Sequence, residues 1–168
     1  MDDWITCQEG HKHFGRYNAA GVLIYQRNLQ TGDIEVLLGQ RAQGTDLPGT
    51  WSTIGGALDK DEEPEDGAFR ELLEETGLER THFGITAWTT ADHGNWLYFT
   101  FCVEHKGDLD LTKIKLDTNE ITALGWFSRQ ALDDPKLPLH PGFKDNMHEL
   151  KFLLPPNINP TTLEFSEW

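Results

Sequence analysis

The stretch from Gly56 to Leu78 limits what this chain can fold into more than any other part of the sequence. Pro64 stands where a helix can begin, because the first helical turn leaves backbone N–H groups unbonded and proline has none to lose. Two acidic residues follow it, which suits the positive end of a helix dipole, and Gly77 stands where a left-handed cap would end the helix. The stretch therefore predicts a loop followed by one short helix.

The expected helix has two faces of different chemistry. At 3.6 residues per turn, one side collects Ala68, Phe69, Leu72, Leu73 and Thr76. The other side collects three acids, Glu71, Glu74 and Glu75. None of them is followed four residues later by Lys or Arg, so the ion pairs that usually support such acids are missing. This pattern is compatible with a solvated helix face and with a site for a divalent cation, since Mg²⁺ prefers oxygen ligands.

The exact order of fixed residues favours the second interpretation. Gly56 is followed after five residues by Glu62, and seven further residues lead to Arg70-Glu71-Leu72, one residue, Glu74-Glu75, one residue and Gly77-Leu78. This order matches every fixed position of the Nudix box, so the chain resembles the Nudix hydrolase family. The resemblance implies an α/β fold, an α/β/α sandwich with a mixed β-sheet.

The resemblance also implies roles for the residues of the box. It assigns Glu71, Glu74 and Glu75 to one or more Mg²⁺ or Mn²⁺ ions, with the carbonyl of Gly55 as a further ligand. Glu71 and Glu74 are in addition candidate catalytic residues. The remaining fixed residues, Gly56, Glu62, Arg70 and Gly77, are structural within the motif. Among them, Arg70 is expected to orient a carboxylate, with Glu62 as its partner.

Many members of this family use one more acid from outside the box, as general base or extra ligand. Glu120 is the best candidate, because it lies six residues before Trp126, and an acid at that distance from a Trp-containing strand recurs in the family. The alternative is an acid on a surface loop. A general base would need only hydrogen-bond reach to the attacking water.

Three residues are candidates for substrate contacts. Arg41 ends a predicted strand close to the box, where many Nudix enzymes carry an arginine that can grip a phosphate through its planar fork. A surface arginine is the alternative. Trp51 and His93 could contact a base, although core packing is the commoner fate of a Trp, and a turn or core position fits His93 at least as well.

Outside the box the chain reads as alternating strands and helices in one domain. The expected strands cover residues 19–25, 35–42, 85–91, 96–104 and 120–127, with 19–25 and 35–42 forming a hairpin. Ser128 is expected to cap a short helical turn, residues 107–117 to form a polar loop, and residues 142–154 to form a terminal helix. The expected parts are an N-terminal extension (1–16), a Nudix hydrolase domain (17–155) and an irregular C-terminal tail (156–168).

Composition excludes some partners. The formal net charge of −14 argues against binding a long nucleic acid through its phosphates, and no apolar run is long enough to cross a membrane. Only two cysteines are present, and two reduced thiols in the cytoplasm are expected. His11 and His13 form a His-x-His pair that could bind a metal, but a loose or edge-packed N-terminal arm is the stronger expectation.

The expected function is Mg²⁺-dependent hydrolysis of a nucleoside diphosphate linked to a group X, with a normal or oxidised nucleoside triphosphate as the leading substrate. Ala91-Asp92-His93 stands where ADP-ribose hydrolases of this family often carry a proline. ADP-ribose or a nucleotide sugar as substrate, and a nucleotide-binding domain without turnover, are the alternatives. The partner is thus a small nucleotide, and the resemblance allows a homodimer.

Overall fold

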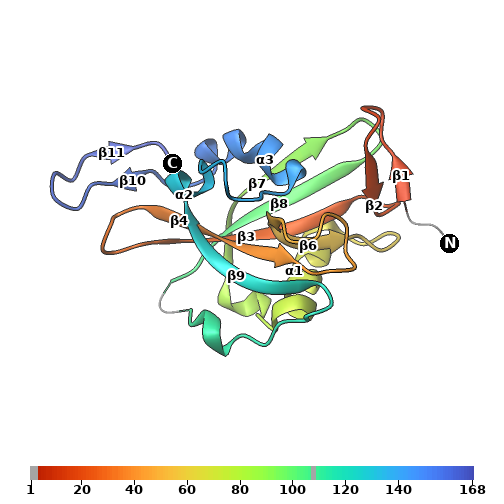
Figure 1. Ribbon diagram of the computed structural model, residues 1–168, viewed down its shortest axis with the longest axis horizontal. Coiled ribbons are helices and arrows are strands. Elements are labelled where there is room, and N and C mark those ends of the chain that lie inside the picture. Colours follow the sequence, from red (N-terminus) through yellow and green to blue (C-terminus); the bar gives the residue numbers. More distant parts are fainter. Residues whose placement is uncertain (1–3, 107–108) are drawn as a thin grey trace.

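The computed structural model describes residues 4–106 and 109–168, and the statements below concern those residues. A mixed seven-stranded sheet runs through the molecule between helices (Figure 1). Its strands are β3 (Ala19–Arg27), β4 (Ile34–Arg41), β5 (Trp51–Ser52), β6 (Ile54–Ala57), β7 (Gly84–Asp92), β8 (Leu97–Glu104) and β9 (Ile121–Ser128). The predicted α/β sandwich and its five long strands are confirmed.

Strand β3 is the centre of this sheet. One edge pairs in parallel with β8, from Ala19 opposite Tyr98 to Tyr25 opposite Glu104. The other edge is shared, because residues 19–22 pair with β6 and residues 25–27 pair with β4. The sheet therefore forks along β3, and the short strands β5 and β6 lie in the fork, where β5 pairs with β4.

The side chains of β3 alternate between two cores, as the period of a strand requires. Its even-numbered residues face a core that includes Ala68, Phe69 and Leu72 of helix α1 (Pro64–Thr76). Its odd-numbered residues Leu23 and Tyr25 face a second core with Leu132 and Leu150. The sheet is thus covered on both faces, with α1 on one side and the C-terminal helices on the other (Figure 1).

Helix α1 has the bounds and the cap that the sequence predicts. Pro64 opens it with two acids in the first turn, and Gly77 ends it at φ 74° with its N–H bonded to the carbonyl of Leu73 at 2.8 Å. Such a φ favours glycine, because a Cβ would meet the neighbouring carbonyl. Short 3₁₀ segments follow at Arg80–His82 (η1) and Leu111–Lys113 (η2).

The C-terminal helices differ in part from the prediction. Ser128 caps the short helix α2 (Arg129–Leu132) by accepting a hydrogen bond from the N–H of Ala131, as expected. The predicted single helix over residues 142–154 is instead split into α3 (Pro141–Asn146) and a 3₁₀ segment η3 (Met147–Phe152). Met147 and Leu150 are still buried in the core, so the apolar residues of this segment can pack against the sheet without forming one continuous helix.

Both termini form small hairpins outside the main sheet. At the N-terminus β1 (Trp4–Thr6) pairs with β2 (Lys12–Phe14), where the sequence predicts a loose or edge-packed arm. At the C-terminus β10 (Asn157–Ile158) pairs with β11 (Phe165–Ser166), where an irregular tail is expected. Trp168 anchors this second hairpin, because its buried indole donates to the carbonyl of Ile34 at 2.9 Å.

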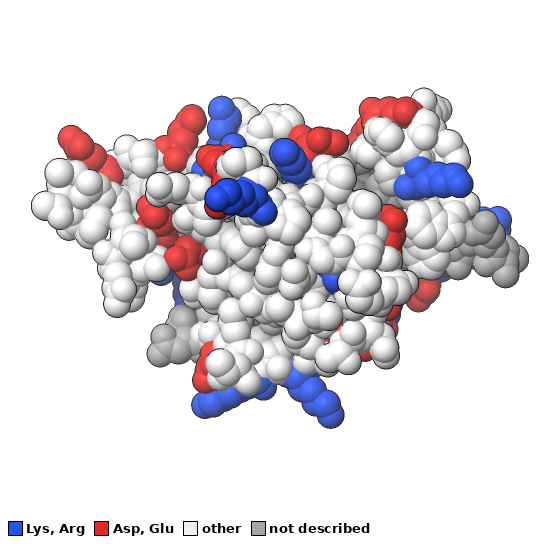
Figure 2. Space-filling model, viewed as in Figure 1, with Lys and Arg blue, Asp and Glu red and all other residues white. Residues whose placement is uncertain are grey.

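The remaining expectations concern the surface and the thiols. On the face that Figure 2 shows, acidic and basic side chains form small scattered groups, and no continuous basic stripe crosses it. Cys7 and Cys102 are free and buried. Within the described ranges, no helix combines the length and the apolar composition that a membrane crossing requires. Residues 107 and 108 of the predicted loop lie outside the described residues.

Candidate active site

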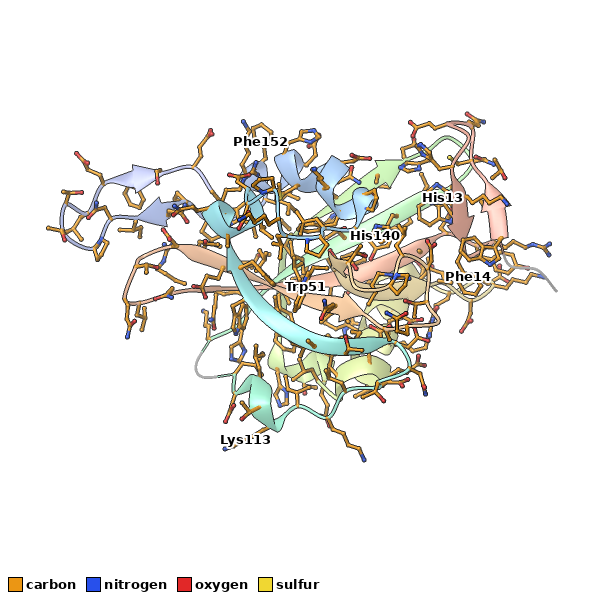
Figure 3. The ribbon with its side chains drawn as sticks, viewed as in Figure 1. His13, Phe14, Trp51, Lys113, His140 and Phe152 are labelled. Atoms are coloured by element: carbon orange, nitrogen blue, oxygen red, sulfur yellow. The ribbon has the colours of Figure 1, made fainter. Side chains whose placement is uncertain are left out.

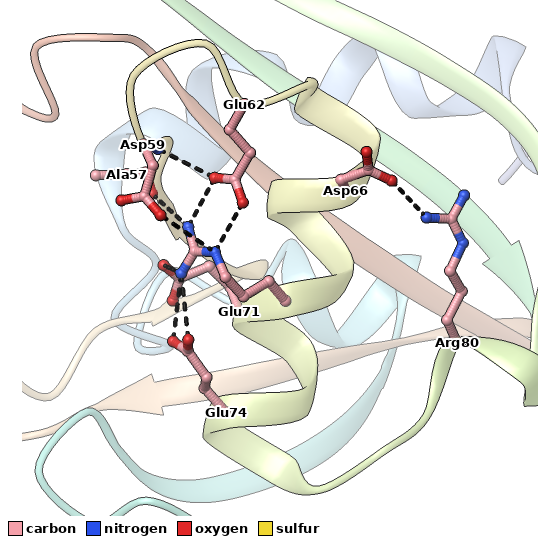
Figure 4. A network of polar contacts seen from close by, with 8 residues as sticks. Ala57, Asp59, Glu62, Asp66, Glu71, Glu74 and Arg80 are labelled. Carbon is pink, nitrogen blue, oxygen red and sulfur yellow. Dashed lines mark hydrogen bonds and ion pairs between the residues drawn. The ribbon is translucent and has the colours of Figure 1, made fainter.

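Arg70, in the middle of α1, is the centre of a polar network, and its partners are labelled in Figure 4. Its Nε and Nη2 each donate to one carboxylate oxygen of Glu62, both at 2.9 Å, and Nη2 also donates to the carbonyl of Ala57 at 3.1 Å. Its Nη1 donates to Glu71 at 3.0 Å and to Glu74 at 3.4 Å. Arg70 therefore ties the loop before the helix to two acids of the helix face, with the partner that the sequence predicts.

The charges in this network support each other. The bond to Arg70 is the main reason why the pKa of Glu62 is lowered, and the bond to Glu62 is the main reason why the pKa of Arg70 is raised. Two parallel N–H···O bonds fix the plane of the guanidinium as well as its position. The carboxylate of Glu71, which shares this cation, is thereby held in one direction.

Glu71 also lies directly against strand β6. A Cβ built on Gly56 would come within 2.6 Å of the Glu71 carboxyl carbon and 2.7 and 2.8 Å of its oxygens. Only glycine leaves room for this approach. Burial raises the pKa of Glu71, and the neighbouring Arg70 opposes this shift. The box thus requires glycine at position 56 for a steric reason, because a side chain there would occupy the space of the Glu71 carboxylate.

Glu75 is the buried acid of the helix, with 6% of its surface exposed. Among the described residues no hydrogen bond or ion pair reaches its carboxylate, in contrast to Glu71. Burial, together with the nearby charges of Glu71 and Glu120, raises its pKa to about 9, while Arg41 lowers it. A carboxylate in such a place is costly to ionise unless a positive charge compensates it.

Glu74 and Glu120 are the exposed acids beside Glu75. The side chain of Glu74 is 56% exposed. Glu120 is also exposed, and it follows a turn that is bound to the helix, because the N–H of Asp117 donates to the carbonyl of Glu75 at 2.9 Å and the N–H of Glu120 to that of Asp117 at 3.0 Å. The turn therefore brings Glu120 to the same acidic group as the three acids of the box.

Gly55 lies where β6 pairs with β3, opposite Gly21. A Cβ on Gly55 would lie 2.3 Å from the carbonyl of Ala20 and 2.8 Å from the Tyr98 hydroxyl, and a Cβ on Gly21 would lie 2.4 Å from the same hydroxyl. The two glycines therefore form a slot for Tyr98. Burial raises the pKa of this tyrosine, with a further contribution from Glu75, so its hydroxyl stays protonated beside the acids.

Arg41 ends β4, and Trp51 begins β5, which pairs with β4. Arg41 stands at an irregularity in the pairing of β4 with β9, and its Nε donates to the carbonyl of Asp46. Trp51 packs edge to face on Phe127 at 5.0 Å, at the border of the second core. His140 lies beside Trp51 in Figure 3, with its N–H bonded to the Trp51 carbonyl at 2.9 Å. Burial, and then the charge of Arg41, lower the pKa of His140.

His93, by contrast, is engaged with the N-terminal hairpin. It stands in the turn between β7 and β8, where its Nδ1 lies 2.9 Å from Nε2 of His13. No contact among the described residues joins it to the acids of α1. The sequence prediction that groups His93 with Arg41 and Trp51 thus combines residues that the fold places in different surroundings.

Sequence reasoning missed Tyr98 and His140 as members of this region. Tyr98 stands in an apolar strand, and only its register opposite Ala19 brings its hydroxyl to the two glycines. His140 stands in a proline-rich connection far from the box. A partial signal existed for Tyr98, since the pair Gly55-Gly56 implies that something bulky or charged must approach β6 closely.

The residues of this region fit a divalent cation. Four carboxylates converge here, one of them buried with no hydrogen-bond donor or cation bonded to it among the described residues. A cation would compensate this charge and would accept the hard oxygen ligands of the acids and of a backbone carbonyl.

Comparisons with known proteins bear on the family of this chain. A family model described as NUDIX domain matches residues 15–150. A Mycobacterium tuberculosis protein named "Putative 8-oxo-dGTP diphosphatase 3" is 37% identical over 159 residues, which cover 89% of this chain and 69% of that protein. The crystal structure of a Nudix hydrolase from M. smegmatis, RenU, matches with a TM-score of 0.75 at 30% identity, over 90% of this chain and 94% of that chain.

A third relative is the "Nucleoside triphosphate pyrophosphatase/Nudix hydrolase fusion protein" of Bifidobacterium longum, which is 35% identical over 108 residues. These residues cover 63% of this chain and 22% of that protein. By fold, motif and relatives, the chain belongs to the Nudix family. It is a Nudix hydrolase, a member of a family whose enzymes generally use divalent metal ions.

Proposed function

We propose that this chain is a Mg²⁺-dependent pyrophosphohydrolase that cleaves a nucleoside triphosphate, with an oxidised purine nucleotide as the first candidate, to a monophosphate and pyrophosphate. The observation that carries the proposal is the buried and unpaired carboxylate of Glu75 within a group of acids. The relative from M. tuberculosis, named for 8-oxo-dGTP, supports the choice of nucleotide.

In this proposal Glu71, Glu74, Glu75 and the carbonyl of Gly55 hold the ion, which would be Mg²⁺ or Mn²⁺. When bound, the ion would neutralise phosphate charge and increase the acidity of water. Arg70 fixes the direction of Glu71 through Glu62, and Gly56 admits the Glu71 carboxylate. These residues support the acids and do not react.

Glu120 is proposed as the general base or as a further ligand. Its backbone is fixed by the Asp117 turn at the end of α1, while its side chain is exposed and free to approach a water molecule. Arg41 is proposed to bind a phosphate, because it is the cation that faces Glu75 and its guanidinium matches phosphate oxygens. Trp51 is proposed to support the base through its exposed part.

The alternatives are ADP-ribose or a nucleotide sugar as substrate, and binding without turnover. In each alternative the ligand carries a diphosphate, which the acids, through the ion, and Arg41 would hold. The location is proposed to be the cytoplasm, where the free thiols of Cys7 and Cys102 would stay reduced. A homodimer, and the boundaries at residues 16 and 155 for the catalytic domain, are proposed on the family resemblance.

A nucleotide panel tests the proposal. The chain is incubated with dGTP, 8-oxo-dGTP, ATP, ADP-ribose and a nucleotide sugar, each with Mg²⁺ and again with excess EDTA, and the products are separated by chromatography. We expect 8-oxo-dGTP to yield the monophosphate and pyrophosphate only with Mg²⁺. Turnover of ADP-ribose or the nucleotide sugar alone would replace the proposed substrate, and turnover that persists in EDTA would overturn the role of the ion.

A further inference from the structure

We propose that Cys7, His11, His13 and His93 form a Zn²⁺ site that fastens the N-terminal hairpin to the turn between β7 and β8. The sulfur of Cys7 and one ring nitrogen of each histidine all lie within 4.8 Å of one another. Three of these residues come from the hairpin and the fourth from a turn about eighty positions further along the chain, so the site exists only in the folded protein.

Hydrogen bonds through the Asn95 side chain hold the two segments together before any ion binds. The N–H of Gln8 bonds to the Asn95 side chain at 2.8 Å, and the Asn95 amide donates to the carbonyl of Thr6 at 3.2 Å. A Cβ on Gly94 would lie 2.2 Å from the Gln8 side chain, so glycine permits this close approach. The hairpin turn closes through the N–H of Cys7, which donates to the carbonyl of His11 at 2.9 Å.

His13 lies in the middle of the group and its ring is fixed. The ring stacks on Trp96 with 3.8 Å between centroids and 8° between planes, and Trp96 is itself anchored by a 2.9 Å bond to the carbonyl of Gly15. Figure 3 shows His13 on β2 at this junction. The stacking holds the ring in one orientation beside Cys7, His11 and His93.

The donor atoms select zinc over the ion proposed for the acidic site. A thiolate and three imidazoles are soft and borderline ligands that suit Zn²⁺, whereas Mg²⁺ prefers oxygen. Around a tetrahedral Zn²⁺ the ligand atoms would lie about 3.3 to 3.6 Å apart. The 2.9 Å between Nδ1 of His93 and Nε2 of His13 therefore needs to widen by less than an ångström.

Four protein ligands leave no open position, which is typical of a structural zinc site rather than a catalytic one. Glu9 adds a negative charge beside the group, 3.7 Å from Nδ1 of His11 and 3.9 Å from Nδ1 of His93. Together with the Cys7 thiolate it would balance the charge of the ion. In this proposal His93 is a zinc ligand and does not contact the nucleotide.

The test uses Zn²⁺ itself as the probe, in the presence of excess Mg²⁺ so that the acidic site of α1 is filled. The purified chain is dialysed against a zinc buffer, and bound zinc is measured by mass spectrometry. We expect one Zn²⁺ per chain, with at least a tenfold loss of affinity in Cys7→Ser, His11→Ala and His93→Ala. His82→Ala is the matched control, an exposed histidine of η1 outside the group, and should bind as the unchanged chain does.

Two further readouts separate a lost ligand from a lost fold. Circular dichroism reports the fold of each variant, and His11→Ala is the safest of them because His11 is exposed at the hairpin turn. Co²⁺ in place of Zn²⁺ should give a sulfur-to-cobalt absorption band that Cys7→Ser removes. The proposal is overturned if the unchanged chain binds no zinc under these conditions, or if folded His11→Ala and His93→Ala bind zinc as tightly as the His82→Ala control.

Discussion

The segment from Glu62 to Glu71, called the first half below, and the last turn of α1 from Glu74 onward, called the second half, place their acids in opposite surroundings. In the first half, Glu62 and Glu71 share the guanidinium of Arg70, and every nitrogen of that group has an acceptor. In the second half, Glu75 is buried, and among the described residues no donor is bonded to its carboxylate. Helix α1 and the loop before it thus contain one acid cluster whose charges are compensated, and one buried acid whose charge is not compensated by a bonded partner among the described residues.

This difference separates acids that the chain itself holds in place, Glu71 among them, from a buried acid whose charge a ligand would compensate. A carboxylate that is paired with arginine contributes to stability and to geometry, because its charge is compensated within the protein. A buried carboxylate without a partner costs free energy in the unliganded protein and is retained when something else binds there. Changes in the two halves should therefore have different signatures in activity and in stability.

The largest effect is expected in the second half of the helix. Glu74→Gln and Glu75→Gln remove negative charge from the proposed ion site and keep the size of the side chain. We expect kcat to fall on the order of a hundredfold to a thousandfold, as for the loss of a main electrostatic group. Steady-state kinetics on the substrate found in the nucleotide panel measure this.

Glu79→Gln is the matched control, because Glu79 follows the same helix but is exposed and outside the acidic group. Its kinetics should stay within about twofold of the unchanged chain, as for a surface substitution away from the site. Near-normal kcat in both Glu74→Gln and Glu75→Gln would contradict the role given to the second half.

A smaller effect on turnover is expected in the first half. Arg70→Lys keeps the charge and loses the paired bonds to Glu62. We expect a loss of about ten- to a hundredfold in kcat, because Glu71 is no longer held in place, and a loss of about 1 to 2 kcal/mol in the free energy of unfolding.

Urea unfolding and kinetics on the same samples check both values. Arg80→Lys is the control, since Arg80 also pairs with two acids of α1, Glu65 and Asp66, but at an exposed position. If Arg70→Lys loses stability and keeps full kcat, Arg70 does not orient the acid.

The contact between β6 and the helix can be tested at Gly56. Gly56→Ala places a methyl group where the Glu71 carboxylate lies. The end of this side chain can move, so we expect less than about 1 kcal/mol of lost stability but about a tenfold loss of kcat.

Gly21→Ala is the contrasting variant, because its methyl group would meet the backbone carbonyl of Ile54 at 2.9 Å in addition to the Tyr98 hydroxyl. It should destabilise by about 1 to 3 kcal/mol, and Tyr98→Phe in the same chain should recover part of this loss. Equal stability of Gly56→Ala and Gly21→Ala would show that the two contacts do not differ as the geometry indicates.

The smallest effect concerns stability alone. In EDTA, Glu75→Gln should raise the free energy of unfolding by about 1 to 3 kcal/mol, because an uncompensated buried carboxylate is removed. Adding Mg²⁺ should raise Tm of the unchanged chain and should raise it less in the variant. Thermal unfolding followed by fluorescence measures both, and a variant that is less stable than the unchanged chain in EDTA would contradict the view that Glu75 is unpaired.

The sequence predicted the helix of the box and the strands well, because their signals are local. Pro64 and Gly77 mark the helix ends, and runs such as Val22 to Tyr25 form a strand wherever they are buried. The break between α3 and η3 was not predictable, since the same apolar residues satisfy the core in either geometry. Strand β6 was missed because its two glycines have low strand propensity and pair only through contact with β3.

The acids of the box were predicted from the motif, and Glu120 and Arg41 outside it were predicted from the family resemblance. Spacing on the helix brings Glu71, Glu74 and Glu75 to one side, but it does not say that Glu75 is the buried one. The slot for Tyr98 and the group around His93 join residues about eighty positions apart. Such proximity depends on strand register and on the path of the turns, neither of which a single sequence records.

The parallel pairing of β3 with β8 also bears on how the chain reaches its folded state. Opposite residues such as Ala19 and Tyr98 are far apart in sequence, and α1 with its acids lies in the connection between the two strands. Closing so long a connection is slow compared with forming a hairpin such as β3–β4. Amide protection in the β3–β4 hairpin is therefore expected to precede protection in β8, and the acidic face of α1 would gain its fixed position only at the later step.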